Sequence, residues 1–89
     1  MDFTPTLDQL SIIRRLAALQ SPGWHSAGNV VFEVGGYSQA DRAAVNRVLS
    51  DLHRARLITR MFVQHRDKPM AAFLLEPDRL EDLLAEYEQ

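Results

Sequence analysis

Hydrophobic residues recur at helical spacing in two long stretches of the chain. In residues 7–20 and again in residues 39–55 they fall on one broad side of a helix, at about 100° per residue. The first stripe holds Leu10, Ile13, Leu16 and Ala17, with Ile12 and Leu19 at its edge, and the second holds Ala44, Val45, Val48, Leu49, Leu52 and Ala55. Each stretch therefore predicts an amphipathic helix with one side in a core.

Both helices have recognisable start and stop signals. Thr6 with Gln9 fits a capping box, in which the glutamine side chain reaches back to the backbone amide of the cap. Ser-Pro-Gly at 21–23 stops the first helix, because proline cannot continue it. Gly-Gly-Tyr-Ser at 35–38 predicts a turn in which glycine supplies positive φ, and its serine with Asp41 resembles a second capping box.

The segment between these helices fits two structures. Ser26 could cap a short helix over residues 27–34, whose apolar residues would lie largely on one side. Against this, Val-Val-Phe-Glu-Val at 30–34 is rich in strand formers and Gly28 weakens a helix, so intrinsic preference slightly favours a strand. We predict the helix, because the elements that follow are more consistent with one at this place.

A β-hairpin and a final helix follow the second stripe. The apolar runs at 57–64 and 70–75 are rich in strand formers and flank the polar loop His-Arg-Asp-Lys-Pro at 65–69, which predicts a hairpin over 57–75. Pro69 should limit pairing beside that loop. Residues 77–88 predict an acidic C-terminal helix with proline at its first position.

The C-terminal helix has a narrow apolar seam. The seam consists of Leu80, Leu83, Leu84 and Tyr87. It either folds back onto the domain or pairs with its twin in a homodimer, since recognition of palindromic sites usually calls for two-fold symmetry. The sequence leaves both alternatives open.

The order helix, helix, turn, helix, hairpin, helix resembles that of known regulators. The segment SQADRAAVNRVLSDLHRARLIT at 38–59, followed by a hairpin, resembles winged helix-turn-helix proteins of the MarR, ArsR and PadR kind and small winged-helix proteins of Mu-like phages. In the passage from recognition helix to wing the resemblance rests on Leu49, Leu52, Leu57 and Ile58. It implies an α+β fold, mainly α, in one domain over residues 1–89, with three helices, a β-hairpin wing and the C-terminal helix.

Composition fits one small domain. The chain has 89 residues, of which 46% are apolar and 25% charged. The absence of cysteine excludes disulfides and thiolate-bound metals and fits a reducing compartment. No apolar run approaches the roughly 20 residues of a membrane span, and residues 1–10 lack signal-peptide features, so we expect a cytoplasmic protein with no membrane partner. The resemblance to winged-helix regulators and phage proteins implies a bacterial or phage origin.

Charge is distributed unevenly although the formal net charge is only −2. Residues 40–68 have a net charge of +4, whereas residues 1–39 have −1 and residues 69–89 have −5. This asymmetry favours a basic functional surface, with double-stranded DNA as partner and the acidic tail turned away from it. The alternative is that the basic and acidic blocks neutralise each other in space.

The side of helix 39–55 opposite the apolar stripe predicts a DNA-reading surface. Ala43 and Ser50 are short, so the helix backbone could come close to a major groove. Arg47 could then pair with guanine and Asn46 with adenine, and Arg42 near the helix start suits a base or phosphate contact. The predicted DNA-binding residues are Arg42, Ala43, Asn46, Arg47, Ser50, Arg54, Arg56, Arg60, Arg66 and Lys68.

The cations beyond the middle of that helix are expected to bind phosphates. Arg54, Arg56 and Arg60 suit contacts that position the protein without specifying bases. In the winged-helix proteins that the chain resembles, the wing lies on the adjacent backbone or minor groove, which implies phosphate contacts for Arg66 and Lys68. The alternative for these two residues is an ordinary polar turn.

No catalytic or cofactor-binding pattern stands out. His25, His53 and His65 are far apart and lack metal-ligand spacing, and no nucleophile–base signature or phosphate-binding glycine loop is present. We therefore predict a sequence-specific DNA-binding transcriptional regulator that is not an enzyme and needs no cofactor or metal.

A protein-interaction module on the same scaffold is the alternative. The net negative charge and the acidic C-terminal helix would suit a phage-type inhibitor or an adaptor that binds a protein instead of DNA. We expect Trp24 to cover the core between the first two helices, and its other interpretation is an exposed anchor for a protein partner.

Overall fold

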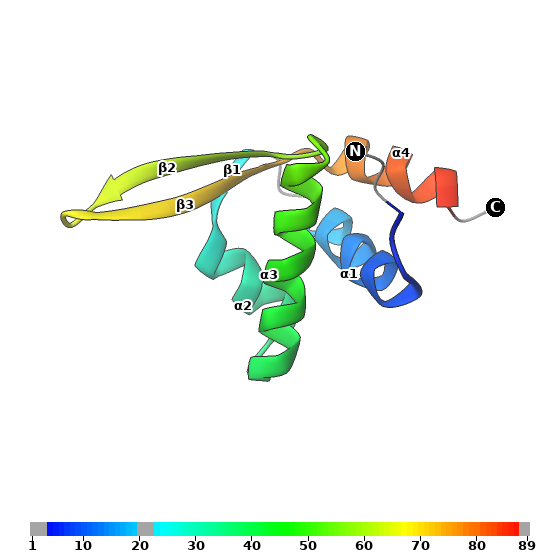
Figure 1. Cartoon of the computed structure of the whole chain (residues 1–89), viewed down its shortest axis with the longest axis horizontal. Coiled ribbons are helices and arrows are strands. Elements are labelled where there is room, and N and C mark those ends of the chain that lie inside the picture. Colours follow the sequence, from blue (N-terminus) through cyan, green and yellow to red (C-terminus); the bar gives the residue numbers. More distant parts are fainter. Residues whose placement is uncertain (1–3, 20–22, 88–89) are drawn as a thin grey trace.

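The computed structural model describes residues 4–19 and 23–87 and confirms a mainly helical α+β fold. The elements follow in the order α1 (Leu7–Ala18), β1 (Gly23–Ser26), α2 (Ala27–Gly35), α3 (Gln39–Arg54), β2 (Thr59–His65), β3 (Lys68–Leu75) and α4 (Pro77–Tyr87) (Figure 1). The helix predicted over 27–34 is confirmed. The predicted helix ends at 20 and 88, and most of the stop signal at 21–23, lie outside the described residues.

One hydrophobic core joins the helices to the inner face of the sheet. Its most completely buried side chains are Ile13, Leu16, Val30, Val45, Val48, Leu49, Leu52, Leu75 and Leu80. The predicted stripes of α1 and α3 supply most of them. Ala44 is instead exposed, and Ala55, which follows the end of α3, is only half-buried. The first turns of α3 extend past α1 (Figure 1).

Hydroxyl side chains cap three of the helices. The Thr6 hydroxyl accepts from the Gln9 amide at 3.2 Å and the Gln9 side chain accepts from the Thr6 amide at 2.9 Å, so the predicted capping box is confirmed. Ser38 accepts from the amide of Asp41 at 3.3 Å. Ser26 caps α2 in the same way, and burial of the valine side of α2 outweighs the strand preference of its residues.

The two glycines between α2 and α3 have different roles. Gly36 has φ of +71°, which glycine adopts readily, so it supplies the predicted turn. Gly35 instead belongs to α2, and a Cβ built on it would lie 2.8 Å from the Cα of Arg42. Gly35 therefore allows the backbones of α2 and α3 to approach closely.

The sheet is three-stranded and antiparallel, in the order β1-β3-β2. Strand β1 was not predicted, because no strand pattern was recognised in residues 23–26. Its register places His25 opposite Phe73, which is buried in the core, and Trp24 opposite Leu74. Neighbouring residues of a strand face opposite sides of a sheet. Trp24 therefore lies on the outer face, 49% exposed, and the expectation that it covers the core was wrong.

The hairpin begins at Thr59 and not at residue 57, its strands reach closer to the tip than predicted, and its turn is tighter. Only Arg66 and Asp67 form the turn, with φ of +51° and +65°, and the strands continue to His65 and Lys68. Positive φ at both turn residues matches the right-handed twist of the strands, and aspartate tolerates it. Pro69 pairs with Gln64 inside the ladder, so the expectation that it limits pairing was wrong. At this non-hydrogen-bonded position the missing N–H would point away from β2.

Most of the apolar seam of α4 is buried in the core of the domain. Leu80, Leu83 and Leu84 are buried in the core, whereas Tyr87 is 40% exposed. The tip of the β2–β3 hairpin and α4 stand at opposite ends of the longest dimension, which measures 46 Å (Figure 1). No helix within residues 4–19 and 23–87 is long and apolar enough to cross a membrane.

Candidate nucleic-acid interface

The outward side of α3 carries the residues that the sequence predicted. Ala43, Asn46, Arg47 and Arg54 are exposed, and Arg42 and Ser50 are half-buried. The opposite side holds Val45, Val48, Leu49 and Leu52, all buried, and this burial fixes the rotation of the helix. The predicted division of α3 into a core side and a polar side is thus observed along most of its length.

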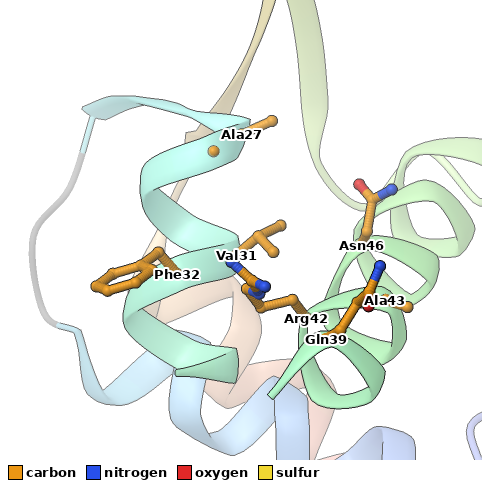
Figure 2. Close-up of a pocket in the computed structure, with 8 residues that line it drawn as sticks. Ala27, Val31, Phe32, Gln39, Arg42, Ala43 and Asn46 are labelled. Atoms are coloured by element: carbon orange, nitrogen blue, oxygen red, sulfur yellow. The ribbon is translucent and has the colours of Figure 1, made fainter. Parts of the chain in front are cut away.

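A hollow between α2 and α3 gathers the first group of predicted residues. This α2–α3 hollow encloses about 550 Å³ and is lined by Ala27, Gly28, Val31, Phe32, Gln39, Arg42, Ala43 and Asn46. In Figure 2 the side chain of Arg42 extends from α3 toward Val31 of α2, and Asn46 stands further along α3. One wall is therefore apolar and the other offers hydrogen-bond donors.

A second hollow lies at the other end of α3. This α3–β2 hollow encloses about 420 Å³ and is lined by Ser50, His53, Arg54, Arg56 and Arg60. It brings together four of the predicted residues from the helix, the following turn and the edge strand. Arg47 lines neither hollow and is exposed on α3.

The predicted wing-tip cations are exposed at the far end of the hairpin. Arg66 lies in the turn and Lys68 begins β3, so both are separated along the strands from the hollow that contains Arg60. Arg60 also stands over the ring of Phe62, with its guanidinium carbon 5.4 Å from the ring centroid. That cation–π contact orients the arginine on the inner face of the wing.

No carboxylate of α4 among the described residues forms an ion pair with these cations. Within the part of the chain that the structure describes, no ion pair joins Arg42 or Arg47 to a carboxylate. Arg54 meets Asp51 at 4.0 Å, but both residues belong to α3. Asp51 in turn accepts a hydrogen bond from the Gln9 side chain at 3.2 Å, which ties α3 to α1.

Sequence reasoning missed the contribution of α2 and of His53. Val31 and Phe32 form part of the α2–α3 hollow, and Phe32 is 45% exposed although large and apolar. Its ring meets the ring of Tyr37 edge to face, with 5.2 Å between centroids. The helical period of α2 leaves Phe32 off its apolar side, and a large apolar residue at that outward position is the signal that could have indicated this hollow.

The histidines and acids form no metal site in the described part of the chain. No three histidine, aspartate or glutamate side chains of the described residues lie close enough together to hold a metal ion. The two hollows on α3 are lined largely by guanidiniums and amides, whose hydrogen-bond donors suit anions and base edges.

A solved structure described as "Possible transcriptional regulator for arsenical resistance" has a similar fold. The two chains align with a TM-score of 0.51 and 27% sequence identity, over 93% of this chain and 83% of the other. The chain is a winged helix-turn-helix domain. No protein-family model and no curated protein matches its sequence.

Both hollows lie at defined positions of the winged-helix fold. Helices α2 and α3 with the turn at Gly36 are the helix-turn-helix, so the α2–α3 hollow lies within that unit. The β2–β3 hairpin is the wing, and the α3–β2 hollow lies where the second helix of the unit meets the wing. The helix α4 packs against α1.

Proposed function

We propose that this winged-helix domain is a small sequence-specific DNA-binding transcriptional regulator, with α3 in the major groove and the β2–β3 hairpin as wing on the backbone. The observation that supports this most is the series of cationic and amide side chains along the outward side of α3, none of them paired with an acid of α4 among the described residues. The similar solved structure, described as a possible transcriptional regulator, supports the same role.

Base recognition would depend on the exposed middle of α3. Arg47 and Asn46 are exposed next to each other there, and their side chains match the acceptor pairs of guanine and the donor–acceptor pair of adenine. Ala43 is short and exposed, so the helix backbone can approach the groove. Arg42 would reach a base or a phosphate from the α2–α3 hollow.

The remaining predicted residues would hold the phosphate backbone. Arg54, Arg56 and Arg60 lie around the α3–β2 hollow, and Arg66 and Lys68 are exposed at the wing tip. Contacts of this kind position the protein and dominate its affinity. The acidic helix α4 lies at the opposite end of the molecule from the wing tip, so its carboxylates would not repel the bound duplex there (Figure 1).

A pair of copies on a palindromic site is part of this proposal. Symmetric operators usually require two-fold related proteins. Because Leu80, Leu83 and Leu84 are already buried in one chain, a dimer would have to use surfaces other than the centre of that seam. Tyr87, 40% exposed at the end of α4, is one residue of the seam that remains accessible to a partner copy.

The salt dependence of duplex binding tests the proposal. If a pair of copies makes about six phosphate contacts, the logarithm of the association constant should fall against the logarithm of salt concentration with a slope near −5. Fluorescence anisotropy of labelled mixed-sequence duplexes, measured at several salt concentrations, gives this slope. The proposal fails if no duplex binds at micromolar protein in low salt.

A protein-interaction module is a second candidate, supported by the outer face of the sheet. The strand register places Trp24, Met61 and Val63 on that face, and they are 49%, 40% and 38% exposed. A protein partner that binds there should be retained from a host lysate after nuclease treatment and lost with Trp24→Ala. Retention that depends on nuclease-sensitive material supports the DNA-binding regulator instead.

A further inference from the structure

The α3–β2 hollow combines cationic side chains from three successive parts of the chain. Ser50, His53 and Arg54 come from the end of α3, Arg56 from the turn and Arg60 from β2. The lining includes three guanidiniums and no carboxylate. Arginine in the last turn of a helix is favoured by the helix dipole alone. That explanation covers Arg54, but not the approach of Arg60 from a different element.

The backbone around this hollow is held in place from two sides. Arg56 has φ of +62°, unusual for a residue other than glycine, and its amide donates to the carbonyl of His53 at 3.0 Å. The guanidinium of Arg79 on α4 donates to the carbonyl of Arg56 at 3.3 Å. The backbone of Arg56 is therefore fixed before any ligand arrives, which lowers that part of the entropy cost of binding.

His53 also lines the hollow, and one of its ring nitrogens has no hydrogen-bond partner among the described residues. Its Nδ1 is buried and has no hydrogen-bond partner among the described residues, an uncommon state for a buried polar atom. A ligand in the hollow would meet the other edge of this imidazole. The nearby acid, Asp51, is not part of the lining and reaches Arg54 only at 4.0 Å, so the three guanidiniums leave the hollow with a net positive charge.

We propose that the α3–β2 hollow is a preformed site for one phosphate group, with Arg54, Arg56 and Arg60 as its cations and His53 and Ser50 as additional contacts. Guanidinium forks match the oxygens of phosphate, and a tetrahedral anion can meet several of them at once, whereas a carboxylate is satisfied by one. The assignment of this phosphate to the DNA backbone rests on the proposed function. A free phosphate compound would have the same chemistry.

Titration of the full chain with inorganic pyrophosphate, followed by NMR, tests the site without DNA. We expect saturable shifts of the His53 imidazole signals and of the backbone amides of Ser50, Arg56 and Arg60. Arg56→Gln together with Arg60→Gln should weaken binding about tenfold or more, because each removes charge-assisted hydrogen bonds. Arg15→Gln, on the exposed side of α1, should leave it unchanged. Absence of these shifts, or equal weakening in the control, would overturn the proposal.

Competition identifies the natural source of the phosphate. A short duplex added at low salt should displace pyrophosphate and reverse the shifts of His53, which supports the backbone assignment. Pyrophosphate that stays bound while the duplex also binds would overturn that assignment, because the duplex then uses other cations. If no duplex binds at all, the proposed function fails, while the pyrophosphate titration still decides whether the hollow is a phosphate site.

Discussion

Replacement of Arg47 by alanine should weaken binding to the preferred duplex by about 1–3 kcal/mol and relax the choice of base at one position. Arg47 is exposed at the middle of α3, lines neither hollow and makes no ion pair in the described part of the chain, so its guanidinium is available to a base edge. The measurement is selection from a randomised duplex library, followed by affinity determination for the best site and its single-base variants.

Arg15→Ala provides the matched control for charge. It removes one positive charge from the exposed side of α1, which contributes to neither hollow. The affinity of the Arg15→Ala variant for all duplexes should change little, and its base preference should match that of the unsubstituted protein. Equal effects of the two substitutions, or an unchanged base preference for Arg47→Ala, would contradict the assignment of Arg47 to base recognition.

Gly35→Ala should destabilise the domain by about 1–3 kcal/mol, the usual cost of overpacking. The added Cβ would lie 2.8 Å from the Cα and 2.9 Å from the N of Arg42, and backbone atoms cannot move aside without shifting α3 relative to α2. Because Arg42 also lines the α2–α3 hollow, duplex binding should weaken as well. Urea denaturation gives the stability change through the transition midpoint at constant slope.

Gly28→Ala is the matched control, because it shows the effect on stability of replacing glycine by alanine in the same helix without the clash at Gly35. Gly28 lies in the same helix, and a Cβ on it meets no atom within 4 Å. Alanine there should stabilise the protein by about 0.5–1 kcal/mol, since glycine is the poorer helix former. If Gly35→Ala were as stable as Gly28→Ala, the close approach of α2 and α3 would not constrain the helix-turn-helix.

The helices were predictable because their signals are local. The capping pairs at Thr6 and Ser38 and the period of the apolar stripes follow from residues within a few positions of each other. The helix over 27–34 was harder, because its valines also suit a strand, and only burial against α1 and α3 decides between the two. The tight approach at Gly35 was not predictable, since it depends on where Arg42 lies in space.

The errors concern contacts between distant parts of the chain. Strand β1 exists because Gly23–Ser26 pairs with β3 almost fifty residues later, and this pairing turns Trp24 outward. The length of the wing depends on a two-residue turn at Arg66 and Asp67 that the composition of the loop did not specify. The sequence correctly indicated which side of α3 faces outward, but not that Arg60 joins Arg54 and Arg56 around one hollow.

NMR mapping of the duplex-binding surface decides whether α3 and the wing tip bind DNA together. Addition of the selected duplex should shift backbone amides along the outward side of α3, from Arg42 to Arg54, and at Arg66 to Lys68 of the wing tip. The amides of α4 should be unchanged. Shifts confined to the outer sheet face around Trp24, or to α4, would contradict the claim that α3 and the wing tip form one DNA-binding surface.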